Sequence, residues 1–458
     1  MRVVIVHYHA RPGGVSSVMQ RHARALLSMG TSVTILTGEP VPEGDEWAGL
    51  DCQVLPELGY STQRMSPNSL VALAAKLHKR AAGAVLHVHN PFLGKNVSWP
   101  DLWTCLVAAG QPMVFHQHDF VEDNRQSLLE QFPDRSLWYP IAENACWVVL
   151  NRRDAAALAA AGVAQRQLRV LPNPVLPSRL GRRPISHPGA TEDTVPQSCI
   201  WYPTRALERK NLGELLLWAC LAPKGVTFLA SVQAHGPEQL ARLSRWQDLS
   251  AELHLPITWA DITACQHPVH CVLSTSIQEG FGYTFAEPWL DDVPVCGRFL
   301  PDAMDCLLQA GLTYPNAYVA IQVQADSEDF GALPEENQKA ILRQLVLPQN
   351  RAQVRIQLAD GHWITAAQWF ERVLADAPQL VRDNRACLEK QFSPQRIANR
   401  LLGIYENIFH AAPGLIGHAD AAMVAQTYSV CSAKQNRLDK TCCAPICHAN
   451  QDALNLVK

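Results

Sequence analysis

Short apolar segments of strand length alternate with helical stretches along most of this chain, and no other feature constrains its fold as strongly. In the first half, the strand candidates are residues 2–6, 32–36, 85–88, 113–115, 146–150 and 168–171. A helical stretch at 15–29 ends at Gly30, a favourable C-terminal cap, and residues 69–82 are rich in Ala and Leu. Strands and helices that alternate in this way are typical of a parallel sheet covered by helices.

The alternation is interrupted once. Residues 173–198 contain many Pro, Gly, Arg and Ser residues without apolar periodicity, which is typical of an inter-domain linker. Beyond this linker the strand candidates are residues 199–203, 226–230, 257–259, 269–275 and 293–296. At 458 residues, the chain is also too long for one ordinary core. We therefore predict an α/β protein with two doubly wound, Rossmann-like domains, at 1–172 and 199–392, with a ligand-binding cleft between them.

A final helix is predicted at 393–410. Ser393 is a favourable N-cap, Pro394 suits the first helical position, and apolar residues at 397, 401, 404, 405 and 408 form one face. From 411 to 458 we expect an irregular tail. Its cysteines at 431, 442, 443 and 447, with a histidine at 448, match no Cys-x2-Cys spacing, so we expect a terminal tail rather than a zinc site.

The composition excludes several classes of protein. Apolar residues make up 48 % of the chain and charged residues 18 %, as in folded globular proteins, and the net charge of −3 argues against nucleic-acid binding. We find no run of 18 or more apolar residues, and the first strand becomes polar too early for a secretory signal. Because the cysteines are also scattered singly, we expect a cytoplasmic protein with reduced thiols.

The segment from Glu279 to Glu287 is the most informative polar segment. It follows an apolar strand, turns at Gly280 and Gly282, and then enters a helical stretch. Glycines allow backbone N–H groups to approach a phosphate or a sugar hydroxyl closely. One carboxylate can face a sugar while the other accepts hydrogen bonds from a ribose, so this segment suits a nucleotide sugar.

Three further segments follow predicted strands. Gly13 and Gly14 form a turn before the first helix, where free N–H groups and the helix dipole favour an anion, although a tight turn without a ligand is the more common reading of such a sequence. Arg205 and Lys210 follow the first strand of the second half and could neutralise a diphosphate, unless they form a solvated basic loop. His118 ends another strand beside polar neighbours and could bind a sugar hydroxyl, or could have a structural role.

Together these segments resemble the retaining GT-B glycosyltransferases of the superfamily that contains glycogen synthases, sucrose-phosphate synthases and bacterial phosphatidylinositol mannosyltransferases (group 1, family 4-like). The resemblance covers roughly residues 1–300 and the final helix. The matching motifs are the Gly-Gly loop at Gly13-Gly14, the strand-end His118-Asp119, the turn at Pro172-Asn173, the spaced pair Arg205 and Lys210, and the Glu-Gly-Phe-Gly segment from Glu279 to Glu287.

The resemblance implies a retaining hexosyltransferase that uses a nucleoside diphosphate sugar and needs no cofactor. By the same resemblance, Arg205 and Lys210 hold the diphosphate, Glu287 holds the ribose, and the final helix braces the N-terminal domain. The transferred sugar contacts Glu279, His118 and the backbone of Phe281, Gly282, Tyr283 and Thr284, while Gly13 and Gly14 also bind the donor. No Asp-x-Asp motif is apparent, so we expect no metal requirement. The acceptor is a small molecule, a glycan or a lipid-linked molecule.

The chain departs from the family pattern in three places, and other readings stay open. Pro288 follows the second glutamate, Asp292 stands where glycine is common, and residues 299–350 lack the usual pattern. A degenerate GT-B protein that binds a sugar nucleotide without transfer, or a sugar-nucleotide epimerase, is therefore an alternative; a nicotinamide oxidoreductase is disfavoured because no dinucleotide fingerprint is found. A peripheral membrane contact is also open, although we expect Arg21, His22 and Arg24 to form a solvated side of the first helix.

Overall fold

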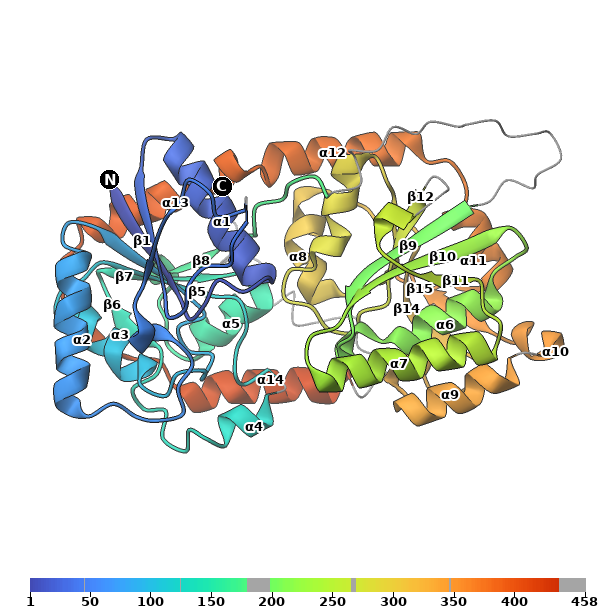
Figure 1. Ribbon diagram of the computed structural model, residues 1–458, viewed down its shortest axis with the longest axis horizontal. Coiled ribbons are helices and arrows are strands. Elements are labelled where there is room, and N and C mark those ends of the chain that lie inside the picture. The colour runs from blue at the N-terminus through green and yellow to red at the C-terminus, as the bar shows by residue number, and fades with distance from the viewer. Residues whose placement is uncertain (45, 124, 179–197, 265–268, 346, 436–458) are drawn as a thin grey trace.

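The two alternating halves of the sequence form two sheets, each covered by helices. The computed structural model describes residues 1–458 except 45, 124, 179–197, 265–268, 346 and 436–458. Figure 1 shows the two α/β lobes side by side, with the first half of the chain in one and most of the second half in the other. This arrangement confirms the predicted fold class. Most of the predicted linker, 179–197, lies outside the described residues.

The first sheet has seven parallel strands in the order β3-β2-β1-β4-β5-β7-β8. Their bounds are Arg2–His7 (β1), Ser32–Thr37 (β2), Asp51–Val54 (β3), Val85–His89 (β4), Met113–Gln117 (β5), Ala145–Val149 (β7) and Leu168–Val170 (β8). All six strands predicted for this half are present. The additional strand, β3, is largely exposed at the sheet edge, so its sequence has no apolar run to reveal it.

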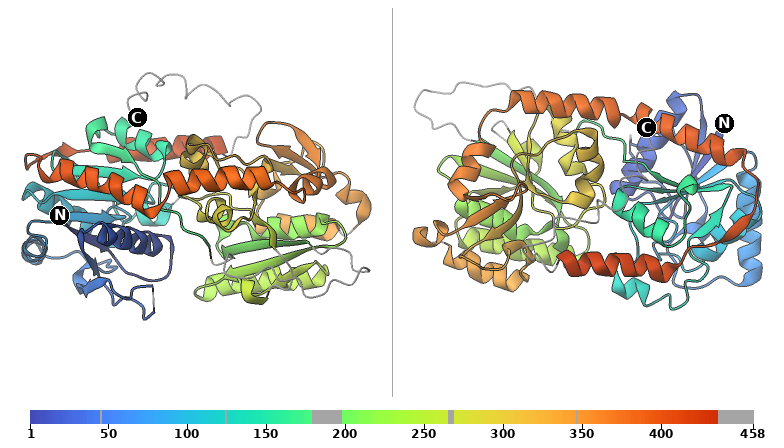
Figure 2. Two further views of the ribbon diagram at one scale, coloured as in Figure 1. Left: turned by 90° about the horizontal axis from the view of Figure 1, so that it is seen from above. Right: turned by 180° about the vertical axis from the view of Figure 1, so that it is seen from behind.

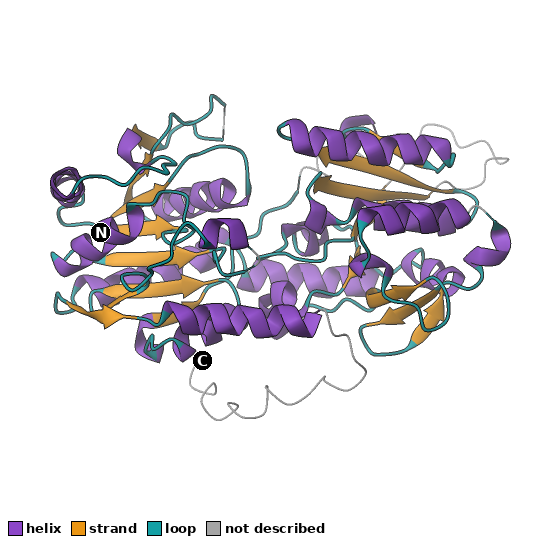
Figure 3. Ribbon diagram, turned by 90° about the horizontal axis from the view of Figure 1, so that it is seen from below, coloured by secondary structure: helices purple, strands orange, loops and turns teal. Residues whose placement is uncertain are grey.

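Side chains of the first sheet alternate between two helical layers, as the pleat of a strand requires. One face packs against α1 (Gly14–Ser28) and α13 (Pro394–Phe409). The other face packs against α2 (Pro67–Arg80), α3 (Trp99–Ala108) and α5 (Arg152–Ala160). Figure 3 shows helices on both sides of each sheet. The remaining short elements of this lobe are α4 (Gln126–Leu129), β6 (Pro140–Ala142) and the 3-10 turns Pro56–Leu58 and Gln165–Gln167.

The second sheet has eight strands in the order β11-β10-β9-β12-β13-β14-β15-β16, and β15 runs antiparallel to both of its neighbours. Their bounds are Ser198–Arg205 (β9), Val226–Gln233 (β10), Ile257–Trp259 (β11), Val269–Ser274 (β12), Val295–Arg298 (β13), Ala317–Gln322 (β14), Arg355–Leu358 (β15) and Trp363–Thr365 (β16). The helices are α6 (Leu212–Leu221), α7 (Pro237–Glu252), α8 (Pro301–Ala310), α9 (Glu335–Gln344), α10 (Pro348–Arg351), α11 (Ala366–Val373) and α12 (Pro378–Gln391). Residues 299–350, which showed little pattern, thus contribute α8, β14 and α9 to this lobe.

The chain returns to the first lobe at its end. Figure 2 shows α12 and α13 in succession along both lobes. The buried face of α13, which includes Ile397, Leu401 and Tyr405, packs with Val3 and Ile5 of the first strand. Helix α13 begins at Pro394 as expected, although the Ser393 side chain forms no cap hydrogen bond.

The expectation of an irregular chain from residue 411 is wrong for residues 415–435. Leu415–His418 (β17) pairs antiparallel with β6, and Ala421–Gln435 (α14) lies along the first lobe, where Val424 and Tyr428 are buried. Asp420 accepts hydrogen bonds from the amides of Ala422 and Met423, as an N-cap residue does. Asp420 is therefore the sequence feature that could have indicated the start of a helix here. Residues 436–458, with most of the tail cysteines, lie outside the described residues.

Among the helices of the described residues, none is both long enough and apolar enough to cross a bilayer.

Candidate active site between the two sheets

Two cationic side chains contact Glu279 beyond the carboxyl ends of β9 and β12. The Lys210 ammonium forms an ion pair with one carboxylate oxygen, and an Arg209 guanidinium nitrogen lies 3.1 Å from the other. The side chains of Lys210 and Glu279 are only 14 % and 10 % exposed. Burial tends to raise the pKa of Glu279, but Lys210 and Arg209 outweigh it and hold that pKa below its ordinary value. Glu279 is therefore a carboxylate, and not a general acid, near neutral pH.

Hydrogen bonds to the backbone fix the position of Lys210. The hydroxyls of Tyr202 and Thr275 both donate to the Lys210 carbonyl, at 2.7 and 2.9 Å. These two residues lie on or directly after the neighbouring strands β9 and β12, so the loop that carries Lys210 is tied to the sheet. Asn211 then adopts a left-handed conformation, with φ of 53°, at the start of α6. These hydrogen bonds tie the backbone of Lys210 to the ends of the two strands.

Arg205 is the last residue of β9 and lies beside this group. Its guanidinium is half-buried, and no described carboxylate approaches it within ion-pairing distance. Burial lowers its pKa, and the nearby Arg209 adds to that effect, although Glu279 opposes both. A partly desolvated cation beside two others is typical of a site that binds an anion.

The Glu279–Gly282 loop touches the first lobe at His118. A Cβ atom on Gly280 would lie 3.3 Å from the His118 carbonyl oxygen, so this close approach favours glycine. Gly282 has φ of 69°, and a Cβ there would lie 2.6 Å from the ring of Phe285. His118 is buried, and its Nε2 lies 2.7 Å from Nδ1 of His89. The structure thus brings the backbone of His118 beside the loop that contains Glu279.

Glu287 makes an ion pair across the two lobes that the sequence did not indicate. An Arg21 guanidinium nitrogen of α1 lies 2.6 Å from the Glu287 carboxylate, and the guanidinium stacks over the Tyr283 ring at 4.6 Å. Arg21 also donates to the Pro174 carbonyl at 2.9 Å. The expectation that Arg21 and His22 form a solvated helix side is wrong, because this side of α1 packs against the second lobe and the first sheet. Burial raises the pKa of Glu287 despite the nearby Arg21.

The segment after Gly282 is less helical than expected. It forms two short 3-10 helices, Tyr283–Phe285 and Glu287–Asp291, in place of an α-helix. Pro288 lies in the first turn of the second one, where a missing N–H costs nothing, and Asp292 ends it in the left-handed region with φ of 60°. Both departures from the family pattern are therefore accommodated by the local backbone, and Glu287 begins the second 3-10 helix.

Gly13 and Gly14 begin α1, after the carboxyl end of β1. Gly13 is the N-cap of the helix, and Gly14 is exposed with open space beside it. No described contact joins either glycine to the Lys210 group, so the structure places them at the correct sheet edge without showing that the two groups converge.

Further ion pairs hold the two lobes together beside the site. Arg152 at the start of α5 forms a bidentate pair with Asp305 of α8, the shorter contact being 2.6 Å. Arg153 reaches Asp302 of the same helix at 3.3 Å. Together with Arg21, these residues close the first lobe onto the second in this structure.

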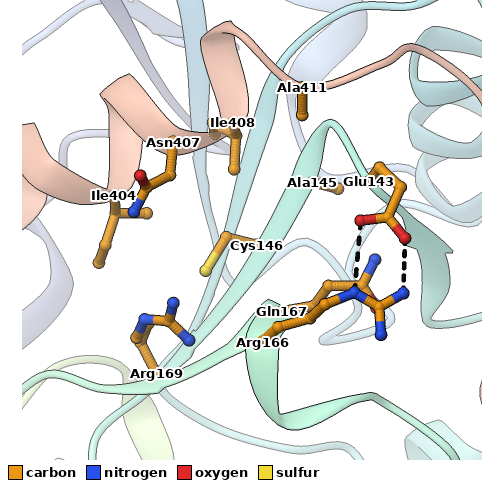
Figure 4. Close-up of a pocket in the computed structure, with 10 residues that line it drawn as sticks. All are labelled: Glu143, Ala145, Cys146, Arg166, Gln167, Arg169, Ile404, Asn407, Ile408 and Ala411. Atoms are coloured by element: carbon orange, nitrogen blue, oxygen red, sulfur yellow. Dashed lines mark hydrogen bonds and ion pairs between the residues drawn. The ribbon is translucent and has the colours of Figure 1, made fainter.

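A pocket of about 190 Å³ lies elsewhere, between the end of α13 and the beginnings of β7 and β8 (Figure 4). Glu143 and Arg166 pair across one side of it, and Cys146 and Ile408 face it. The pocket is at the amino ends of these strands. Ligands of parallel sheets bind at the carboxyl ends, so we do not assign the active site here.

Two cations of the site were missed as functional candidates. Arg209 adjoins Lys210 in the segment predicted to bind the diphosphate, but only the spacing of Arg205 and Lys210 matched the family motif. Arg21 had no signal of its own, since a single arginine on a helix gives no indication of the lobe that it faces.

Comparison with known proteins agrees with the motifs. The profile of Glycosyltransferase Family 4 matches residues 12–179. The chain is 23 % identical over 386 residues to mannosylglucosyl-3-phosphoglycerate synthase from Petrotoga mobilis. The aligned region covers 77 % of this chain and 75 % of that protein.

Solved structures share the fold at low identity. Anabaena Alr3699/HepE in complex with UDP covers 89 % of this chain and 100 % of its own, with 14 % identity and a TM-score of 0.56. A glycosyltransferase from Rickettsia africae covers 89 % and 98 %, with 14 % identity and a TM-score of 0.58. WaaG, a glycosyltransferase of lipopolysaccharide biosynthesis, covers 88 % and 100 %, with 12 % identity and a TM-score of 0.52. These matches confirm the predicted GT-B fold, and the family match confirms the predicted resemblance.

Proposed function

We propose that this chain, a GT-B glycosyltransferase whose first lobe matches Glycosyltransferase Family 4, transfers a hexose from a uridine diphosphate sugar to an acceptor hydroxyl with retention of configuration. The observation that carries the proposal is the charge around Glu279. Arg209 and Lys210 pair with this carboxylate and Arg205 lies beside them, so three cations and one anion leave a net charge of +2 where two strands end. A diphosphate is the part of the donor that this charge fits. The uridine and hexose are inferred from HepE, a structural relative solved with UDP-glucose.

The reaction transfers the anomeric carbon from the diphosphate oxygen to the acceptor oxygen. As that bond breaks, negative charge develops on the diphosphate, and the three cations stabilise it without reorganising. Preorganised charge of this kind is usually the largest catalytic effect, and losing one such group costs about 3–4 kcal/mol. The leaving phosphate itself accepts the acceptor proton, so neither glutamate acts as a nucleophile. Glu279, paired with Lys210 and Arg209, orients those cations and accepts hydrogen bonds from the sugar.

Glu287 is assigned to the donor ribose. Its carboxylate lies at the junction of the two lobes, and its side chain is only 20 % exposed. The Arg21 ion pair occupies it in this structure, so the ribose has to displace Arg21. Donor entry thus couples to separation of the lobes at α1, and reclosure would exclude water from the transferred sugar.

His118, Gly13 and Gly14 come from the first lobe. His118 is mostly buried beside Gly280, and burial lowers its pKa to about 4, so at neutral pH it is an uncharged hydrogen-bonding group for a sugar hydroxyl. The amides at Gly13 and Gly14 would face the diphosphate when the donor is bound. The acceptor, whether a small molecule, a glycan or a lipid-linked molecule, would bind to the same lobe.

The test is a panel of nucleoside diphosphate sugars, with thermal shift and release of nucleoside diphosphate measured on the same protein. We expect one uridine diphosphate hexose to raise the melting temperature and to be hydrolysed slowly. Arg205→Ala should abolish both effects without lowering the melting temperature of the free protein. Arg382→Ala, which removes an exposed arginine on α12, should preserve both effects.

Each alternative predicts a different result. Stabilisation without hydrolysis, even with acceptors added, would favour a degenerate binding protein. A new sugar nucleotide formed without an acceptor would favour an epimerase. If no sugar nucleotide of the panel raises the melting temperature of the well-folded protein or is hydrolysed by it, the proposal is contradicted.

A further inference from the structure

A cluster of buried histidines lies under α1, apart from the charges that surround Glu279. His87 and His89 come from β4, His116 from β5 and His22 from α1, and all four side chains are at most 1 % exposed. One ring nitrogen from each of the four can be chosen so that all four atoms lie within 4.8 Å of one another. Four imidazoles converging in a protein interior are a common donor set for a transition metal.

The strand register explains how the sheet assembles three of them. Val85 and Val114 pack on the face of the sheet that α1 and α13 cover. Positions two residues further along a strand return to the same face, so His87, His89 and His116 also lie under these helices. His89 is paired with His116 in the parallel ladder of β4 and β5. The centre of the His22 ring then lies 5.7–5.8 Å from the ring centres of the other three.

The hydrogen-bonding of the cluster is incomplete. Neither ring nitrogen of His22 has a hydrogen-bond partner among the described residues, and Nε2 of His89 and Nε2 of His116 have none either. Buried polar atoms are nearly always satisfied, because leaving one unpaired in an apolar interior is costly. A neutral imidazole nitrogen without a proton is also the form that binds a metal.

The outer contacts are those that metal-bound histidines usually make. The Tyr405 hydroxyl of α13 lies 2.7 Å from Nδ1 of His87, and Nε2 of His118 lies 2.7 Å from Nδ1 of His89. A second hydrogen bond on the far nitrogen fixes the tautomer and the orientation of a ligand ring. His87 and His89 thus have one oriented nitrogen each. The other nitrogen of His87, Nε2, lies 3.0 Å from Nδ1 of His116 inside the cluster, and the other nitrogen of His89, Nε2, has no hydrogen-bond partner among the described residues.

From this geometry we propose that His22, His87, His89 and His116 bind one divalent transition-metal ion of the zinc type inside the first lobe. Zn–N distances of about 2.0–2.1 Å place the nitrogens of a tetrahedral site about 3.3 Å apart. The widest pair in the cluster therefore has to close by about 1.5 Å, which small ring rotations provide. The ion ties α1 to the central strands. Through His89, it also sets the tautomer of His118, which would then present its Nδ1 proton to the site.

This ion differs from a metal at the donor diphosphate, for which the sequence shows no Asp-x-Asp motif. Its role is structural and positioning, because its ligands lie below the site. The proposal rests on the cluster alone and holds whether or not the chain transfers a hexose from uridine diphosphate.

The first experiment measures metal content on untagged, full-length protein. After dialysis against EDTA and then against Zn²⁺ or Co²⁺ followed by buffer, we expect about one ion per chain, and a Co²⁺ spectrum with the visible bands of a tetrahedral site and no thiolate charge transfer. Metal should raise the melting temperature by about 5 °C or more. The tail cysteines are the competing ligands, so the double variant Cys442→Ser/Cys443→Ser should still bind one ion.

The decisive variant is His22→Phe, which replaces an unpartnered imidazole with an apolar ring of similar size. We expect it to fold, to lose the ion, and to melt at the same temperature with Zn²⁺ as with EDTA. His7→Phe is the matched control, because His7 is buried at the end of the neighbouring strand but is outside the cluster; it should retain the ion.

Two outcomes would overturn the proposal. One is wild-type protein that contains no ion after exposure to Zn²⁺, Co²⁺, Ni²⁺ and Cu²⁺. The other is His22→Phe that binds as much metal as the wild type, since the ion would then lie elsewhere.

Discussion

Substitutions in the ion pair of Lys210 with Glu279 should affect catalysis and stability separately, and both effects can be measured. Lys210→Met removes one of the three cations that would stabilise the leaving diphosphate. Loss of one such group costs about 3–4 kcal/mol of transition-state stabilisation, so we expect kcat for donor hydrolysis or transfer to fall by about 10²–10³-fold.

The same substitution should also destabilise the fold, but by less than the loss of one partner from a fully buried ion pair usually does. Removing one partner of a fully buried pair costs about 3–5 kcal/mol. Here Arg209 still lies 3.1 Å from Glu279, and its side chain is 39 % exposed, so it can screen the carboxylate that remains. We expect a loss of about 1–2 kcal/mol, which corresponds to a fall of about 3–6 °C in melting temperature.

The double variant Lys210→Met/Glu279→Gln distinguishes the two effects. Replacing the carboxylate by an amide removes the unpaired buried charge, so the melting temperature should recover most of its loss while kcat stays low. Lys224→Met, which removes an exposed lysine of the same lobe, is the control and should change neither quantity. Nucleoside diphosphate release at saturating donor, with a thermal melt of each protein, gives both numbers. Single-variant activity within about threefold of the wild type, or recovery of activity in the double variant, would refute the assignment.

Three further predictions follow from other contacts. Arg21→Met frees Glu287 from a partly buried ion pair worth about 1 kcal/mol, so UDP should bind about 3–10-fold more tightly by calorimetry; equal or weaker binding would mean that Glu287 does not hold the ribose. Glu214→Ala breaks the fully buried pair with Arg298 at 2.6 Å, but Asp329 still lies 2.9 Å from that guanidinium, so the free energy of unfolding should fall by about 2–3 kcal/mol, less than for an orphaned charge; a loss under about 1 kcal/mol in chemical denaturation would show that the site relaxes. Six buried histidines have pKa values that burial lowers, to about 3 for two of them and about 4 for a third, so the folded chain stays neutral there while the unfolded chain takes up protons below pH 6.5. The free energy of unfolding is therefore intact above pH 6.5 and falls as the pH is lowered, by about 1.4 kcal/mol per histidine at pH 5.5. A urea midpoint that is unchanged between about pH 7.5 and 5.5 would contradict this prediction. The six residues are His7, His22, His87, His89, His116 and His118.

Local patterns in the sequence were sufficient for the fold class and for the residues of one loop. Apolar runs at strand length separated by helical stretches determine a parallel, helix-covered sheet because each element must bury its own apolar face. The Lys210 and Glu279 segments each follow a strand, and the carboxyl ends of neighbouring parallel strands meet at one edge, so the proximity of these two residues followed from the fold class. Elements with little apolar signal, such as β3 at its exposed edge, were missed for the same reason.

Long-range contacts were decided only by the tertiary structure. Whether Arg21 faces solvent or Glu287 depends on how the two lobes meet, and their separation in the sequence gives no local pattern to indicate it. The histidines show the same division: the His-x-His spacing at 87–89 and at 116–118 fixes that each pair shares a face of its strand. Which strands are neighbours, and that α1 brings His22 onto that face, follows from packing, because a side chain's partners are set by which elements cover it and not by its place in the chain.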